Sequence, residues 1–404
     1  MPLITTRVTT AQDATVKNSP LTNAEIDNNF ININNAIRLS GDVTGFQDRT
    51  SSSLAWVDAT RTLTLAPTGA NFTAYYKGKA VTVSTPQTVI IANTNGHHWI
   101  HWDYTQNRLV DLGSNPNLKD NLLVAYIYWD SSSTYAPIVA DERHSVSRDL
   151  NWHYYQHTTN GAIWKSGGDM SYTINNSNNV TLGFPNSSTV PIVLADEDLE
   201  HSIIHSDTAA NPYEQNLYNS STNVASLPIL YLNGTTYKQT SVSATPWLTS
   251  STRAYYNPIT SGSGALAIAP TDNTYLVYWV VATNCSRHPI KLIIGRTMWN
   301  SYSEAETENF DAYGLSLPEI APMYKIILQT SSTFTQNTSR VKIIGVRELV
   351  GKQNSRSNSF DTFSHDALSD RNLTNQHSIS SITDLQTTLD SISGSAIAMS
   401  IALG

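Results

Sequence analysis

Charged residues are scarce in this chain of 404 residues, where Asp, Glu, Lys and Arg together make up 14%. An ordinary soluble protein carries roughly 25%. Ser, Thr and Asn supply the polar surface instead, and the chain also contains 20 Tyr and 9 Trp. Because β-branched and aromatic side chains favour strands, and Asn and Ser favour turns, the composition predicts a mainly β protein.

The chain also lacks a basic stripe and a long apolar run. Its formal net charge is −8, whereas nucleic-acid binding needs a positively charged surface. No stretch approaches the roughly 18 apolar residues of a membrane-spanning helix, and the N-terminus has no apolar signal-peptide core. We therefore expect no nucleic-acid partner and no membrane insertion, and we expect assembly in the cytoplasm of the cell that makes the protein.

The motifs of the common enzyme classes are missing as well. A single cysteine, Cys285, excludes an intrachain disulfide and a multi-cysteine zinc site, and we expect it to be buried as a small apolar residue. Gly262, Gly264 and Ala267 nominally match a dinucleotide fingerprint, but no strong strand precedes them and no helix follows. We predict no catalytic residues, no cofactor and no enzymatic activity.

The most regular pattern near the N-terminus is a helix signal. Thr22 and Glu25 form a capping box, from which a helix is expected to run to about residue 39. The apolar residues of this helix form a seam with spacings of four, three and four residues: Ile26, Phe30, Ile33 and Ile37. Ile31 lies off this seam. An isoleucine-rich seam favours three or more strands, and two heptads are too short to hold alone. We therefore expect an oligomer contact, with a lone helix packed on its own domain as the alternative.

Alternating and continuous apolar runs between residues 46 and 350 predict short strands separated by Gly, Pro and Asn turns. These strands are expected at 61–66, 80–84, 88–91, 98–102, 122–129, 227–232, 275–282, 290–294, 323–328 and 341–346. The run at 122–129 is the most apolar and is expected to be central, and Asn233-Gly234 signals a hairpin. One helix is expected from Ser301 or Ser303 to about Tyr313.

The predicted fold class is therefore mainly β, with antiparallel β-sandwich or meander domains and short terminal α-helices that form trimeric coiled-coil seams. We expect an N-terminal segment over 1–45, β domains over 46–165 and 166–275, and a β-rich domain with one helix over 276–350. A linker and a C-terminal helical oligomerisation module are expected over 351–404.

The C-terminal module has the clearest heptad pattern of the chain. Apolar residues alternate at spacings of three and four: Ile382, Leu385, Leu389, Ile392, Ala396, Met399 and Leu403. Gly394 weakens a helix by about 1 kcal/mol relative to Ala and is expected to break it. Because a polar linker separates this segment from any core, we expect it to contact other chains.

Histidines gather in two stretches of the sequence. His97, His101 and Asp103 share one face of an expected strand, and a second group follows: His144, His153 and His157. Such residues can form an octahedral N/O metal site on a three-fold axis. Hydrogen bonding within a sheet rich in Tyr and Trp is the simpler interpretation, so we predict no metal ligand.

One acidic run, Asp196-Glu-Asp-Leu-Glu200, offers paired carboxylates of the kind that cleave glycosidic bonds. Acidic loops are usually solvated, and we expect this run to be a solvated loop.

Two segments resemble parts of a known protein family. Residues 20–35, Pro-Leu-Thr-Asn-Ala-Glu-Ile-Asp-Asn-Asn-Phe-Ile-Asn-Ile-Asn-Asn, resemble the attachment segment near the start of many fibre and baseplate proteins of tailed bacteriophages. Residues 365–371 and 377–386 are similar to a module that joins a globular part of phage tail fibres to a coiled coil. Asp141-Glu-Arg-His144 and residues 156–162 look like stretches of related virion proteins.

The resemblance implies a homotrimer in the virion tail whose N-terminus docks on the virion. Because the chain stops at Gly404 soon after the C-terminal module, we expect a fibre adaptor or baseplate subunit whose partners are other tail or fibre proteins. One alternative is a receptor-binding protein that stacks a host surface glycan, such as lipopolysaccharide, on its Trp and Tyr side chains. A glycan depolymerase is the remaining alternative.

Overall fold

The computed structural model describes residues 4–6, 14–40, 43–113, 121–146, 150–218, 224–250, 252–310 and 319–349. The chain divides into two compact units, Met1–Gln353 and Asn354–Gly404, and all described residues belong to the first. The predicted C-terminal seam lies outside the described residues: Ile382, Leu385, Leu389, Ile392, Ala396, Met399 and Leu403. The oligomer contact expected there stays a prediction.

Strands dominate the described residues, which confirms the mainly β fold class. The first group forms three antiparallel sheets in the orders β3-β6-β7, β4-β5-β8 and β10-β9-β11-β12. β11 lies between β9 and β12, so the expected central strand is confirmed. The bounds are β3 Gly45–Phe46, β4 Ser52–Val57, β5 Thr62–Pro67, β6 Phe72–Tyr76, β7 Lys79–Val83, β8 Gln87–Ile90, β9 Gly96–Asp103, β10 Arg108–Asp111, β11 Leu122–Asp130 and β12 Tyr135–Asp141.

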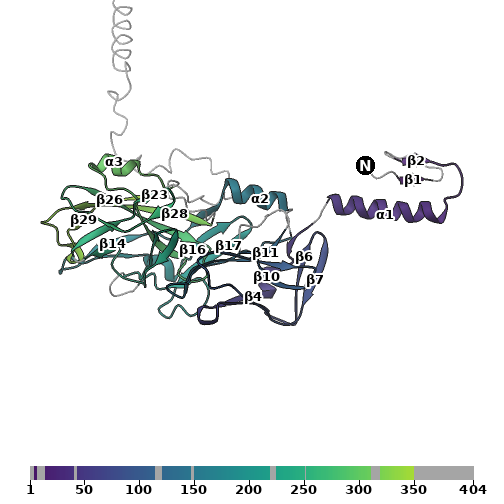
Figure 1. Cartoon of the computed structure of the whole chain (residues 1–404), viewed down its shortest axis with the longest axis horizontal. Coiled ribbons are helices and arrows are strands. Elements are labelled where there is room, and N and C mark those ends of the chain that lie inside the picture. Colours follow the sequence, from purple (N-terminus) through teal and green to yellow (C-terminus); the bar gives the residue numbers. More distant parts are fainter. Residues whose placement is uncertain are drawn as a thin grey trace, which may run out of the picture. The chain divides into compact units, whose positions relative to one another are not determined.

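The second group centres on a six-stranded sheet in the order β20-β19-β27-β26-β28-β29. Figure 1 labels its strands β26, β28 and β29. Both faces of this sheet are covered, because Tyr278 and Val280 of β26 join one buried apolar cluster and Val277 and Trp279 join another. A strand buried on both faces is continuously apolar. The bounds are β19 Ile229–Asn233, β20 Thr236–Gln239, β26 Tyr275–Thr283, β27 Ile290–Ile294, β28 Ile320–Thr330 and β29 Val341–Glu348.

Smaller sheets complete the described part. A four-stranded sheet has the order β13-β16-β17-β18. Its strands and the shorter ones are β1 Ile4–Thr6, β2 Ala14–Val16, β13 Ala162–Ser166, β14 Ser171–Ile174, β15 Val180–Gly183, β16 Ile192–Asp196, β17 Leu199–His205, β18 Glu214–Gln215, β21 Thr249–Ser250, β22 Arg253–Tyr256, β23 Ile259–Thr260, β24 Ser263–Gly264 and β25 Ala267–Ile268. Short 3₁₀ turns span Arg49–Ser51, Asp58–Thr60, Pro185–Ser188 and Gln336–Thr338.

The helices among the described residues are α1 Asn23–Ser40, α2 Leu150–Thr159 and α3 Tyr302–Thr307. The capping box before α1 is confirmed, since Glu25 N donates to Thr22 Oγ1 and Thr22 N donates to Glu25 Oε2 at 2.7 Å. Ser301 caps α3 as expected. None of these helices is long and apolar enough to cross a membrane.

Two expectations about helices are wrong. α3 ends at Thr307 instead of about Tyr313, because Glu308 leaves the helix and accepts hydrogen bonds from Trp299 Nε1 at 2.6 Å and Arg296 N at 2.9 Å. The domain expected over 46–165 is predicted to consist of strands, yet it contains α2. Its apolar residues do not follow a helical stripe, which is why periodicity missed it.

Cys285 is fully buried and unpaired, as the sequence predicts. It packs in the apolar cluster that contains Trp99 and Trp279.

His201 of β17 makes folding sensitive to acid. Its buried ring stacks on Tyr213 at 4.6 Å. Burial lowers the pKa of His201 to about 4. The nearby charges of Arg49 and His144 lower this pKa further, whereas the charge of Asp141 raises it. The ordinary pKa is about 6.5, so between these pH values the unfolded chain binds a proton that the folded chain does not. Stability therefore falls as the pH falls through this window, by up to about 3 kcal/mol.

We expect a His201→Leu variant to lose less stability than the wild type between pH 7 and pH 5, measured by urea unfolding at each pH. An identical pH slope in both proteins would show that His201 does not carry this effect.

Candidate metal centre

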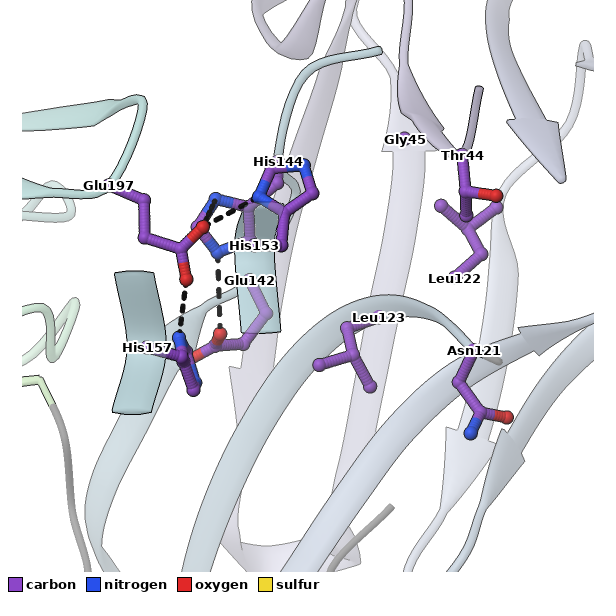
Figure 2. Close-up of a pocket in the computed structure, with 10 residues that line it drawn as sticks. All are labelled: Thr44, Gly45, Asn121, Leu122, Leu123, Glu142, His144, His153, His157 and Glu197. Carbon is purple, nitrogen blue, oxygen red and sulfur yellow. Dashed lines mark hydrogen bonds and ion pairs between the residues drawn. The ribbon is translucent and has the colours of Figure 1, made fainter. Parts of the chain in front are cut away.

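Eight ionisable side chains gather at one place and are called here the histidine–carboxylate cluster. They come from the residues after β12, from α2, from the turn between β16 and β17, and from the residue before β28. The members are Glu142, His144, His153, His157, Asp196, Glu197, Asp198 and Glu319. Figure 2 shows the three imidazoles turned toward Glu197, with Glu142 beside them. Four segments far apart in the sequence thus meet here.

α2 supplies two of the imidazoles. His153 and His157 are four residues apart and so lie on one face of the helix, and both are buried, whereas Tyr154 and Tyr155 are exposed. A surface helix usually buries an apolar stripe against the core. α2 instead contacts the rest of the protein through its histidines.

The hairpin turn between β16 and β17 supplies the central carboxylate. Asp196 pairs with Leu199 across the turn, which leaves Glu197 and Asp198 as its two residues. Glu197 has a φ of +52°, a left-handed conformation that costs a residue other than glycine about 1–2 kcal/mol. Its carboxylate oxygens lie 2.6 Å from His153 Nδ1 and 2.6 Å from His157 Nδ1.

Asp198 and the β3 backbone fix the position of His144. Asp198 Oδ1 lies 2.6 Å from His144 Nδ1, and its other oxygen accepts from Ser145 N at 2.8 Å. Phe46 N donates to His144 O at 2.7 Å, and Gly45 lies against the same stretch of backbone. The imidazole is therefore held at both its ring and its main chain.

Five side-chain atoms of the cluster are buried without a hydrogen-bond partner: Glu142 Oε2, His144 Nε2, His153 Nε2, His157 Nε2 and Glu319 Oε1. His157 Nε2 lies 2.9 Å from Glu319 Oε1 without the alignment of a hydrogen bond, and His144 Nε2 lies 3.7 Å from Glu142 Oε2. Buried polar atoms in proteins almost always have a partner. These five atoms therefore need an explanation.

A small cavity of about 30 Å³ is lined in part by Glu142, His144, His153 and His157, but not by Glu319. A water molecule needs only about 10–15 Å³ of such space. The cavity therefore has room for an ion or a water molecule.

Two of the imidazoles, those of His144 and His157, have strongly shifted pKa values. Burial alone lowers the pKa of His157, but Glu197 and Glu319 outweigh burial and raise it to about 12. Burial also opposes protonation of His144, yet Asp198 and Glu142 hold its pKa well above the ordinary value. Burial raises the pKa of Glu197, but the hydrogen bonds from His153 and His157 lower it to about 2.

Two further carboxylates are shifted in the opposite direction. Burial, with Glu142 nearby, raises the pKa of Glu319 to about 7. The pKa of Asp196 is well above its ordinary value because of burial and then of Glu319 and Glu142. Five carboxylates face three imidazoles in the cluster, so the site has a surplus of groups that attract positive charge.

The structure brings together only the second of the two histidine stretches. His97 lies 2.7 Å from Tyr126 OH through Nδ1, and Asp103 accepts from the backbone of Thr105 and Gln106. Among the described residues, His97, His101 and Asp103 belong to none of the groups with metal-ligand spacing. The partners of His97 and Asp103 lie within one sheet and its turn, as the hydrogen-bonding interpretation expects, whereas His101 Nδ1 is buried without a hydrogen-bond partner.

The expectation that the acidic run is a solvated loop is wrong for most of it. Asp196 is buried, and it accepts a hydrogen bond from Asn284 Nδ2 at 2.9 Å. The Glu197 side chain is buried against the imidazoles, while Glu200 is exposed. Sequence reasoning also missed Glu319, since no motif surrounds it.

Comparison with known proteins finds no matching family model, no matching curated protein and no matching solved structure.

Proposed function

We propose that this chain is a structural virion protein of a tailed bacteriophage. In this proposal it is a homotrimeric tail fibre or fibre-adaptor subunit of the baseplate, which connects the tail to other fibre proteins and catalyses no reaction. The resemblance of residues 20–35 to phage attachment segments motivates the proposal. The observation that supports it best is the exposed apolar seam of α1.

Three residues of that seam are exposed in the single chain. Phe30 is 68% exposed, Ile33 is 40% exposed and Ile26 is 38% exposed. Ile37 also lies in α1. Burying a side chain of this size contributes about 1.5–3 kcal/mol, and an isoleucine-rich seam suits three strands. Assembly of three α1 helices would bury the seam.

A polar contact holds the N-terminal strand β1 on α1. Thr5 N donates to Asn29 Oδ1 at 2.8 Å, and Asn29 Nδ2 donates to Thr5 O at 2.7 Å. Lys17 and Glu25 form an ion pair across the same segment. Because these contacts use polar side chains of α1, they leave Phe30 and its apolar neighbours exposed.

Light scattering on the purified chain tests the trimer. We expect a mass three times the 44.4 kDa of one chain. A Phe30→Asn variant is expected to dissociate at higher concentration, because each chain loses about 1.5–3 kcal/mol of burial. A wild-type monomer at micromolar concentration would overturn the proposal.

Ile31→Asn is the matched control. Ile31 is 54% exposed on the same helix but lies off the seam. If the trimer forms through the seam, this variant keeps the wild-type mass. Equal dissociation of both variants would point to general unfolding of α1.

Binding of a host glycan is a second candidate function, favoured by exposed aromatic rings. Tyr154 and Tyr155 of α2 and Tyr172 of β14 are all exposed, and sugars stack on such rings. Labelled protein that binds host cells, with binding blocked by purified lipopolysaccharide, would support this function. Cleavage of glycan by Asp196 and Glu197 is disfavoured, because both carboxylates are buried and held by other side chains.

A further inference from the structure

We propose that the histidine–carboxylate cluster binds one divalent transition-metal ion, Zn²⁺ in the first place, through His144 Nε2, His157 Nε2, Glu142 Oε2 and Glu319 Oε1. This role is independent of the proposed virion function, and it concerns a site inside one chain.

The four ligand atoms are among the five buried atoms of the cluster that have no hydrogen-bond partner, the fifth being His153 Nε2. All four have less than 1 Å² of exposed surface, and Glu142 is 0% exposed and Glu319 3%. An unpaired buried carboxylate oxygen or ring nitrogen is costly. A cation bound between them would satisfy all four atoms together.

Two pairs of these atoms are spaced nearly as in a metal site. In a tetrahedral zinc site with bonds near 2.1 Å, neighbouring ligand atoms lie about 3.4 Å apart. The His157–Glu319 distance of 2.9 Å and the His144–Glu142 distance of 3.7 Å fall on either side of that value. Glu142, His157 and Glu319 each have a ligand atom within 4.8 Å of the other two, and His144 has this spacing with His157, Asp196 and Glu197.

The remaining atoms of three of these ligands are already held in place. His157 Nδ1 pairs with Glu197, His144 Nδ1 pairs with Asp198, and Glu142 Oε1 accepts from Asn284 Nδ2 at 3.3 Å. On binding a metal, each ring would release its Nε2 proton, while Nδ1 keeps its hydrogen and donates it to the carboxylate. This carboxylate–histidine arrangement is typical of metal ligands in proteins.

The types of ligand atom indicate which class of metal ion the site prefers. Mg²⁺ and Ca²⁺ prefer ligand sets made of oxygen, whereas two imidazoles with two carboxylates suit Zn²⁺ and its first-row neighbours. Four protein ligands fill a tetrahedral zinc site and leave no open position for a substrate. We therefore assign the ion a structural role.

That role is to connect segments that apolar packing joins weakly. Glu142 and His144 follow β12, His157 belongs to α2, and Glu319 precedes β28. α2 buries His153 and His157 and exposes Tyr154 and Tyr155. An ion at this place would anchor α2 to the sheets.

Metal analysis of the full chain tests this proposal. Protein stripped with a chelator and dialysed against Zn²⁺ should retain about one ion per chain by mass spectrometry. Its melting temperature should rise by at least about 3 °C at a hundredfold excess over the dissociation constant, with no rise in Mg²⁺. X-ray absorption of the zinc-loaded wild type should show two imidazoles with oxygen ligands, a result that needs no variant to fold.

His157→Gln and Glu319→Gln should each lower zinc affinity by at least about 100-fold, while Asn284→Ala should lower it by about 10–100-fold. His288→Gln and Glu200→Gln remove the same chemical groups outside the four ligands and should bind zinc like the wild type. The proposal is wrong if the wild type retains no ion and its melting temperature does not change when Zn²⁺ is added. It is also wrong if folded His157→Gln and Glu319→Gln bind zinc as tightly as the wild type.

Discussion

Replacing Arg143 with methionine is expected to lower the free energy of unfolding by about 3–5 kcal/mol, because it leaves the buried charge of Asp141 without its main partner. Arg143 binds Asp141 with two parallel hydrogen bonds of 2.8 and 2.7 Å. Its third nitrogen donates to Ser52 O at 2.7 Å. Arg49 lies 3.4 Å from Asp141 and offsets only part of the loss.

Denaturant unfolding of the purified variants measures this effect. Arg108→Met is the control, since Arg108 is exposed and binds only Gln106 among the contacts described for it; we expect a change within about 0.5 kcal/mol. Adding Asp141→Asn to Arg143→Met should recover part of the lost stability, because no unpaired charge then remains. Equal losses in Arg143→Met and Arg108→Met would show that the buried pair does not stabilise the fold.

Replacing Gly45 with alanine is expected to cost about 2–4 kcal/mol. Gly45 has a φ of +144°, and a Cβ there would lie 2.7 Å from His144 O and from the carbonyl carbon of Ser145. Both neighbours are backbone atoms, which cannot rotate away as a side chain can. The same hydrogen-bonded stretch carries His144, so the substitution should also weaken zinc binding.

Gly69→Ala is the matched control for Gly45→Ala. A Cβ at Gly69 meets nothing within 4 Å, and its φ is not in the left-handed range. We expect its melting temperature to match the wild type within about 1 °C, measured by circular dichroism. If Gly45→Ala melts like Gly69→Ala, the close contact between β3 and His144 does not limit stability.

The residues of the stretch Asp141–His144 contribute to two different sites. Asp141 and Arg143 pair with each other, and Arg143 reaches β4 at Ser52. Glu142 and His144 belong to the histidine–carboxylate cluster. Alternate residues of the stretch therefore belong to different sites: Asp141 and Arg143 form a buried ion pair, and Glu142 and His144 belong to the candidate metal centre.

Local sequence patterns were enough to predict the elements that depend on interactions between residues close in the sequence. The capping boxes at Thr22 and Ser301 and the apolar run at 122–129 predicted elements that the structure confirms. The exposed seam of α1 is also readable from spacing, because its residues lie within one helix. These features depend on neighbours a few residues away, which the sequence shows directly.

Only the tertiary structure decided the candidate metal centre. Glu142 and Glu319 are 177 residues apart, yet a ligand atom from each lies within 4.8 Å of the other and of His157. Periodicity missed α2 because that helix is held by His153 and His157 and not by an apolar stripe. The acidic run was assigned to solvent because its partners come from α2, from the residues after β12 and from Asn284, and only the folded chain brings these segments beside the β16–β17 turn. The sequence alone specified the donor groups, and long-range folding determined which of them meet.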